Sequence, residues 1–301
     1  MTGLDLHCSA QTKALGERLA GSASAAERFL LVELPLPWPS KIESHEVLAA
    51  VTLAPGTRVQ GIRPADEQTK STDSRIISYR RRYDEFGAFA RFERTEASVL
   101  NNELAATLGA IATGDDGPLQ GNDSSTTDVL VCTHGSRDRC CGSLGSQLLL
   151  ELAASVGPTV RLWKTSHTGG HRFAPTAITF PDGLTWGFID ATTMQSVLDR
   201  SGEPHSLVPH LRGCAGFDDR GAQVADAAAF GEAGWSWLDS PRTVSALGTA
   251  ATGHVTASGS DVSYRVDLRE IDSVPTPICT EPIEIAAKAT RQLVVEQLTT
   301  L

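Results

Sequence analysis

The stretch that decides the fold spans residues 128–171 and reads DVLVCTHGSRDRCCGSLGSQLLLELAASVGPTVRLWKTSHTGGH. It opens with a short apolar run that ends at Cys132 and is typical of a buried strand. After a loop with glycine and arginine, apolar residues recur every four positions over residues 143–156, which predicts an amphipathic helix. Residues 159–164 then predict a second strand, and a loop with two histidines follows it.

Two further apolar runs, residues 177–180 and 184–189, flank the turn Pro181-Asp182-Gly183 and indicate a β-hairpin. The complete order is therefore strand, loop, helix, strand, loop and antiparallel hairpin. That is the order of a thioredoxin-like sheet, in which a helix joins the first two strands as a crossover between parallel neighbours. We predict an α/β fold with a thioredoxin-like unit at its centre.

A polar, turn-rich segment at residues 113–127 is the best candidate for a domain boundary. We expect an N-terminal α/β domain over residues 1–122, and a thioredoxin-like domain with a C-terminal α+β extension over residues 123–301. The sequence leaves open whether the N-terminal domain is a second, degenerate thioredoxin-like unit. The other predicted elements are strands at 29–34, 76–79 and 262–268 and near Val244 and His254, and helices at 97–111, 221–238 and 285–298.

Composition and charge disfavour several classes of protein. The chain has 301 residues and a formal net charge of −10, which disfavours a general nucleic-acid binder. No apolar run approaches the roughly 20 residues of a membrane span, and the N-terminus lacks a secretory pattern. We therefore expect a cytoplasmic protein with reduced thiols, in which clustered cysteines bind metal or do redox chemistry. Three cysteines without ligand spacing are expected to be buried small apolar residues: Cys8, Cys214 and Cys279.

Two cysteines and two histidines follow the predicted parallel strands. Eight residues separate Cys132 from Cys141, and three separate His167 from His171. Cys132 ends one strand and His167 follows the next, so both belong to the edge of the sheet where α/β proteins usually place their sites. Cys141 returns to that edge at the start of the predicted helix, where a thiolate is favoured. These four residues can therefore reach one metal group.

Two thiolates and two imidazoles suit either zinc or a [2Fe–2S] cluster in which histidines replace two cysteines. Structural zinc sites usually pair cysteines two to four residues apart, and the wider loop here is better suited to a two-iron cluster. A DNA-reading finger is disfavoured because a helix and a strand separate Cys141 from His167. A Rieske centre is disfavoured because the sequence supplies its Cys-x-His half, at residues 132–134, without the second half.

Residues 132–142, CTHGSRDRCCG, and residues 167–175, HTGGHRFAP, resemble the sucrase/ferredoxin-like family of thioredoxin-like ferredoxins. Residues 211–214, LRGC, resemble it too, and the similarity extends over about residues 126–240 and more loosely over the N-terminal half. The resemblance implies a bis-histidinyl [2Fe–2S] cluster, and it implies that Cys140 is not a ligand. The cluster and metal ligands that it implies are Cys132, Cys141, His167 and His171.

The resemblance also implies an iron–sulfur electron carrier or redox component, with redox proteins as donor and acceptor, rather than a stand-alone substrate-transforming enzyme. Imidazole ligands make the cluster less negative, so we expect a reduction potential above the roughly −400 mV of plant-type ferredoxins. An added electron favours protonation of an imidazole, so we expect proton-coupled one-electron transfer. Two alternatives stay open: a zinc-stabilised binding module with the same four ligands, and a thioredoxin-fold thiol oxidoreductase. The latter would use Cys140 or Cys141, but the sequence lacks a Cys-x-x-Cys motif.

Other residues of the two loops are candidates for contacts around the ligands. We expect His134 to be a loop residue that supports them. Arg137 and Arg172 either tune the cluster, bind a partner's carboxylates or pair with local acids such as Asp138. The two glycines of the histidine loop, Gly169 and Gly170, would let the backbone approach a bulky inorganic group.

Overall fold

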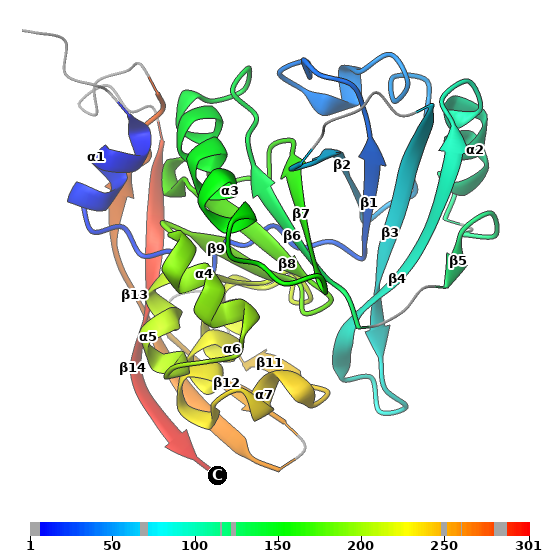
Figure 1. Cartoon of the computed structure of the whole chain (residues 1–301). Helices are drawn as coiled ribbons and strands as arrows, with labels where there is room; N and C mark the ends of the chain where they lie inside the picture. The colour runs from blue at the N-terminus through cyan, green and yellow to red at the C-terminus, as the bar shows by residue number, and fades with distance from the viewer. Residues whose placement is uncertain are drawn as a thin grey trace, which may run out of the picture.

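Helices and strands alternate along most of the chain. The computed structural model describes residues 7–66, 72–114, 116–121, 125–247, 252–259, 261–279 and 288–301. Within these residues lie a large mixed sheet and a smaller antiparallel sheet (Figure 1). The α/β class predicted from the sequence is confirmed.

The large sheet has ten strands in the order β10-β9-β8-β6-β7-β2-β1-β3-β4-β5. Its N-terminal half comprises β1 (Arg28–Glu33), β2 (Thr57–Pro64), β3 (Asp73–Tyr83), β4 (Phe89–Leu100) and β5 (Gln120–Gly121). Its C-terminal half comprises β6 (Thr127–Cys132), β7 (Val160–Thr165), β8 (Thr176–Phe180), β9 (Leu184–Gly187) and β10 (Leu211–Cys214). The predicted strands at 29–34, 76–79, 128–131 and 159–164 correspond to β1, β3, β6 and β7, and the predicted hairpin is β8 and β9.

Each half of the sheet repeats one arrangement of four strands. In the C-terminal half, β6 lies parallel to β7 and antiparallel to β8, which pairs antiparallel with β9. In the N-terminal half, β1 lies parallel to β2 and antiparallel to β3, which pairs antiparallel with β4. The halves join where β2 pairs antiparallel with β7. The predicted division between residues 122 and 123 falls between the halves of one continuous sheet, and it stays a prediction.

Aromatic rings from both halves pack on one another. Phe180 of β8 stacks on Tyr79 of β3, with ring centroids 4.1 Å apart. It also meets the rings of Phe29 and Phe92 edge to face, at 5.1 and 5.4 Å. Burying each of these side chains contributes about 1.5–3 kcal/mol, and edge-to-face pairs add to that. This packing holds the two halves of the sheet in one body.

A buried carboxylate reinforces the same junction. Asp128 of β6 accepts hydrogen bonds from Arg161 and Trp163 of β7 at 2.6 to 2.7 Å. It also accepts one from the Tyr79 hydroxyl of β3, and Arg94 of β4 lies 3.4 Å away. Burial alone would raise the pKa of Asp128, but the hydrogen bonds and charge of Arg161 lower it below its usual value. Asp128 therefore stays ionised and ties strands of the two halves together.

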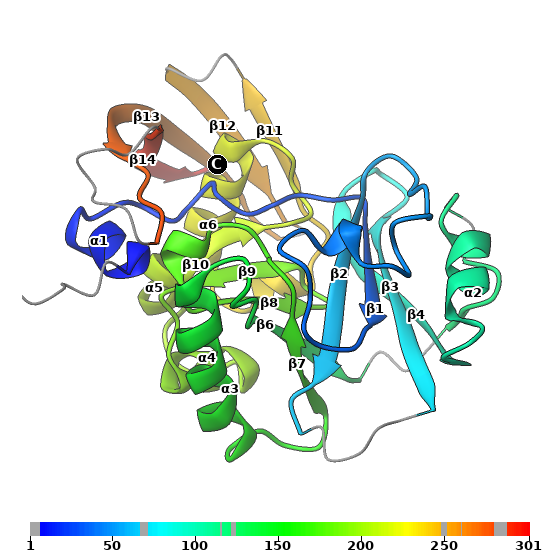
Figure 2. The same ribbon diagram turned by 90° about the horizontal axis from the view of Figure 1, so that it is seen from above.

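Helices cover both faces of the C-terminal half (Figure 2). On one face lie α3 (Ser146–Ala153) and α4 (Ala191–Leu198), whereas α6 (Arg220–Ala233) lies between the other face and the small sheet. In the N-terminal half, α2 (Leu104–Ile111) packs over β1, β2 and β3. The shorter helical elements are α1 (Cys8–Ala14), η1 (Ile42–Ser44), α5 (Pro204–Leu207), η4 (Val208–His210) and α7 (Ser236–Asp239). Among the described residues, no helix has both the length and the apolar character needed to cross a membrane.

The small sheet forms most of the predicted C-terminal extension. Its strands run antiparallel in the order β11 (Thr243–Leu247), β12 (Thr252–Ser258), β13 (Ser263–Pro275) and β14 (Ala289–Thr300). The helix predicted at 285–298 is wrong from residue 289 onward, because this segment is β14 and pairs with β13. A partner strand and the β-branched Val294 and Val295 favour a strand over the helical pattern. Residues 285–287 lie outside the described residues.

Two other predicted helices need correction. Residues 97–100, expected in a helix, continue β4, with Ala97 opposite Ile76 of β3, and the helix begins only at Leu104. Pairing with a neighbouring strand overrides the helical propensity of this segment. The helix predicted at 221–238 is broken into α6 and α7 at Gly234, whose φ is 84°. Glycine adopts this left-handed conformation readily and commonly ends helices.

Candidate metal centre

The loops after β6 and β7 carry the four predicted ligands. Cys132 is the last residue of β6, and Cys141 opens the π-helical turn η2 (Cys141–Gly145) that leads into α3. His167 follows β7, and His171 opens the turn η3 (His171–Phe173). Because β6 and β7 are parallel neighbours, with Cys132 opposite Thr165, both loops leave the sheet at the same edge.

Cys132 and Cys141 form a buried pair of thiols. Their sulfur atoms and one ring nitrogen of His167 all lie within 4.8 Å of one another. A hydrogen bond with Cys141 lowers the pKa of Cys132 well below its usual value, although burial opposes this. The same hydrogen bond, together with burial, raises the pKa of Cys141. The pair therefore shares one proton, and Cys132 is held as the thiolate, which is the form that binds metal.

His167 presents a ring nitrogen that the rest of the described structure does not use. Its Nδ1 is buried and makes no hydrogen bond among the described residues. Its backbone N–H donates to Nδ1 of His134 at 3.0 Å, and Nε2 of His134 donates to the Pro39 carbonyl at 2.9 Å. His134 is therefore oriented to support the His167 backbone, and its two nitrogens are already occupied. Buried polar atoms are normally paired, so the unpaired Nδ1 of His167 is the atom best placed to take a metal.

His171 lies beside this group and contacts Asp138. Its Nδ1 is 2.8 Å from Oδ2 of Asp138 and 3.2 Å from Sγ of Cys8, which leaves Nε2 as its nitrogen available for metal. The ring centroids of His167 and His171 are 5.9 Å apart. Burial would raise the pKa of Asp138, but His171 lowers it below its usual value, so the carboxylate stays charged. Histidines that bind metal commonly donate their other N–H to a carboxylate.

Two arginines bring positive charge to the thiols. Arg58 of β2 donates from Nη2 to the His167 carbonyl at 3.0 Å. Arg212 of β10 is buried and donates to the carbonyl of Gly169 at 3.0 Å and to the hydroxyl of Ser22 at 3.1 Å. Burial and the neighbouring arginines lower the pKa of Arg212 to about 9, whereas the charges of the two thiols raise it. These cations therefore stabilise negative charge at the site.

The predicted arginines of the ligand loops have other contacts. Arg172 forms a 2.6 Å ion pair with the buried Glu17, so it pairs with an acid other than the expected Asp138. Arg137 donates to the Ser40 carbonyl at 3.4 Å. Neither contact involves a predicted ligand.

Gly169 and Gly170 serve the backbone of the histidine loop. Their φ angles are 87° and 63°, in the left-handed region that favours glycine. A Cβ on Gly170 would lie 2.6 Å from the guanidinium of Arg212. Their positions are therefore explained by the close packing of Arg212, in addition to the approach of a metal group that the sequence suggested.

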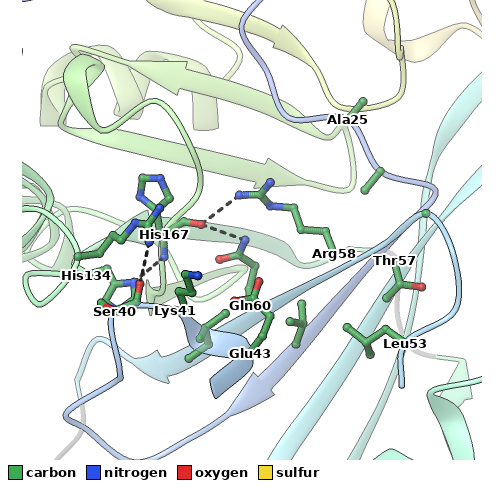
Figure 3. Close-up of a pocket in the computed structure, with 15 residues that line it drawn as sticks. Ala25, Ser40, Lys41, Glu43, Leu53, Thr57, Arg58, Gln60, His134 and His167 are labelled. Atoms are coloured by element: carbon green, nitrogen blue, oxygen red, sulfur yellow. Dashed lines mark hydrogen bonds between the residues drawn. The ribbon is translucent and has the colours of Figure 1, made fainter. Parts of the chain in front are cut away.

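A pocket of about 620 Å³ opens beside His167 (Figure 3). Figure 3 shows His134 and His167 at one end of it, with Arg58 reaching toward the His167 carbonyl. The pocket gives solvent a route to His167, whereas Cys132 and Cys141 stay fully buried. Residues of both sheet halves line it, including Lys41, Glu43, Arg58, Arg137 and His167.

The sequence did not predict how the remaining cysteines are arranged. Cys214 is buried, as expected. Cys8 and Cys279 instead come together with Cys140 and Asp138 next to His171. The available signal was arithmetic: six cysteines, two of them predicted ligands, leave enough thiols for a second group. Long-range convergence of single cysteines has no local pattern that would reveal it.

The close approach of Gly145 to the end of β6 gives a testable prediction. In Gly145→Ala the new Cβ would lie 1.9 Å from the Cys132 carbonyl oxygen, so α3 and the ligand loop must move apart. Overpacking costs about 1–3 kcal/mol, and we expect a loss at the upper end because the contact is with backbone. Denaturant unfolding measures it.

Gly109→Ala is the matched control, because Gly109 lies in α2 and its Cβ would meet open space. This variant should be neutral or gain about 0.5–1 kcal/mol. Equal stabilities of the two variants would contradict the packing at Gly145.

The fold and this edge define an α/β protein with a cysteine–histidine candidate metal centre. A family model described as sucrase/ferredoxin-like matches residues 19–213, and the chain belongs to this family. The chain is similar to altered inheritance of mitochondria protein 32 of Meyerozyma guilliermondii, with 30% identity over 79 residues. That region is 24% of this chain and 28% of the relative, so the chain spans little more than a quarter of that protein. No solved structure matches the chain.

Proposed function

We propose that this chain binds a [2Fe–2S] cluster through Cys132, Cys141, His167 and His171 and transfers electrons. The observation that carries the proposal is the meeting of a buried thiol–thiolate pair with the unpartnered nitrogen of His167. Two sulfur and two imidazole donors are a known ligand set for such clusters, and membership of the sucrase/ferredoxin-like family supports the same reading. When bound, the cluster supplies reversible uptake of a single electron.

We also propose that both halves of the large sheet are thioredoxin-like units. The C-terminal half has the predicted strand, helix, strand and hairpin order, with β7, β6, β8 and β9 as neighbours. The N-terminal half has the same order and directions in β2, β1, β3 and β4, although the short turn η1 replaces the crossover helix. A degenerate second unit accounts for this repetition. It supplies Arg58 and the pocket wall instead of ligands.

The surroundings of the site suit a carrier that exchanges electrons with partner proteins. Charges of Arg58 and Arg212 favour the more negative, reduced state and so raise the reduction potential. His167 lines a pocket and His171 is partly exposed, whereas the two cysteines are buried. We propose that redox partners approach the histidine side. The six cysteines are free thiols, which fits the proposed reducing cytoplasm.

Iron and sulfide analysis of the purified chain tests this function. We expect about two iron and two sulfide per cluster-loaded chain and a red-brown protein that absorbs visible light. A second candidate is a zinc ion held by the same residues, which the short separations among Cys132, Cys141 and His167 favour. A colourless protein with zinc in the place of iron would select that candidate and reject the cluster.

The third candidate, a thiol oxidoreductase, predicts a different loss pattern. Thiol–disulfide exchange through Cys140 or Cys141 needs no imidazole ligand, so its activity would survive replacement of both His167 and His171 by alanine. An electron carrier would lose its iron in the same double variant. Measuring iron content and disulfide reduction on one preparation separates the two functions.

The potential of the loaded protein is expected to depend on pH. An electron added at the site favours a proton on an imidazole ligand, and the Asp138 carboxylate beside His171 Nδ1 can hold that proton in place. The reduction potential should then fall by up to about 59 mV per pH unit in the coupled range. Potentiometric titration at several pH values measures it. A potential that is flat from about pH 6 to 9 would reject the coupling to protons.

A further inference from the structure

Three cysteines from distant segments meet Asp138 next to the proposed cluster site. Cys8 is the first residue of α1, Cys140 directly precedes η2, and Cys279 follows β13. Figures 1 and 2 show α1 beside the ends of β13 and β14. Sγ of Cys140 lies 3.6 Å from that of Cys8 and 3.1 Å from that of Cys279, and the third separation is 3.5 Å. We call Cys8, Cys140, Cys279 and Asp138 the three-cysteine cluster.

We propose that the three-cysteine cluster binds one zinc ion through its three sulfurs and the Asp138 carboxylate. The four donor atoms all lie within 4.8 Å of one another. Oδ1 of Asp138 is 3.4 Å from Sγ of Cys279, and Oδ2 is 3.9 Å from Sγ of Cys8. In a tetrahedral site with Zn–S bonds of about 2.3 Å, neighbouring sulfurs are about 3.8 Å apart. The observed separations approach that value and exceed the roughly 2.05 Å of a disulfide bond.

The geometry fits a single ion better than a polynuclear cluster. Donors to different irons of one cluster lie on opposite sides of it, whereas these four donors are mutual neighbours. The other site differs, because His171 falls outside the group formed by Cys132, Cys141 and His167. Soft thiolates select zinc over magnesium or calcium. Four protein ligands complete a tetrahedral shell, which is typical of a structural site.

Such a zinc ion would join the two ends of the chain to the ligand loop. Cys8 and Cys140 are 132 residues apart, and Cys140 and Cys279 are 139 apart. Cys8 and Cys279 both lie outside residues 19–213, which match the family model, so the cluster anchors the flanking segments on the part of the chain that matches. Oδ2 of Asp138 also contacts Nδ1 of His171. Only this last link rests on the proposed function, since the zinc site itself does not need an iron–sulfur cluster.

Zinc and iron content of the full-length chain and three variants tests the proposal. We expect about one zinc per chain in the wild type, and a loss of about fivefold or more in Cys8→Ser and Cys279→Ser. Cys214→Ser is the matched control, because this thiol is buried elsewhere, and it should keep its zinc. Circular dichroism of each variant verifies that the fold is retained. Zinc-free wild type should also take up one equivalent of cobalt(II) and show thiolate-to-cobalt absorption, which Cys8→Ser should lose.

Several results would overturn the proposal. Zinc retained in both Cys8→Ser and Cys279→Ser would do so, and so would a wild type that binds neither zinc nor cobalt. A disulfide between Cys140 and Cys279 in the freshly purified protein would replace the metal site with a redox pair. Cys132→Ser keeps the two proposals apart: loss of iron with retained zinc supports both, whereas loss of zinc there would place the ion at the other site.

Discussion

Cys132→Ser is expected to be purified without visible absorption and with its iron content reduced by about tenfold or more. Cys132 is fully buried at the end of β6, and its sulfur is held as a thiolate between Cys141 and His167. A serine hydroxyl stays protonated near neutral pH and is a poor ligand for iron. Metal analysis and the visible spectrum of the purified variant measure the effect.

Cys214→Ser supplies the comparison for this variant. Cys214 is equally buried, and its sulfur contacts only the Asp182 carbonyl and the Gly216 N–H at 3.4 Å and Arg242 at 3.9 Å. A serine can keep these contacts, so iron and colour should be retained. If both variants lost iron to the same degree, the loss would reflect general destabilisation and not the removal of a ligand.

Asp128→Asn is expected to lower the free energy of unfolding by about 3–5 kcal/mol. The variant leaves Arg161 and the largely buried Arg94 without the carboxylate that compensates them. It also disturbs the hydrogen bonds that Asp128 accepts from Trp163 and the Tyr79 hydroxyl. Denaturant unfolding at neutral pH measures this change.

The effect of Asp128→Asn should shrink in acid. The pKa of Asp128 is lowered in the folded protein, so its stabilisation is fully present above the unfolded-state pKa of about 3.9. It is lost as the pH falls through the lowered pKa of the folded state, because the wild type then also carries a neutral side chain. Asp239→Asn, which alters the exposed pair with Arg200, should cost at most about 1 kcal/mol. A cost for Asp128→Asn as small as that of the control would mean that the buried network does not hold the sheet halves together.

The sequence predicted those parts of the fold whose local pattern and partners agree. The buried runs that became β1, β6 and β7 have apolar side chains on both faces, which is typical of strands inside a covered sheet. The hairpin of β8 and β9 carries its own turn signal. In contrast, residues 97–100 and 289–298 have helical patterns but pair with β3 and β13. Those partners are distant in sequence or joined through a long connection, so local propensity could not predict the outcome.

Prediction of the candidate site had the same limit. The parallel strands β6 and β7 bring Cys132 and His167 to one edge, and this follows from their order alone. Arg58 of β2 reaches the His167 carbonyl because β2 pairs with β7, a contact between the two halves that no local motif indicates. Cys8 and Cys279 approach Cys140 from opposite ends of the chain, and only the folded structure reveals it.

Pulsed electron paramagnetic resonance of the reduced protein, with and without ¹⁵N-labelled histidine, tests the central claim most directly. We predict the signal of a reduced two-iron centre with couplings to two imidazole nitrogens, one of which disappears in His167→Cys. A signal without histidine nitrogen couplings, or a protein that binds zinc at Cys132 and gives no signal on reduction, would contradict the account.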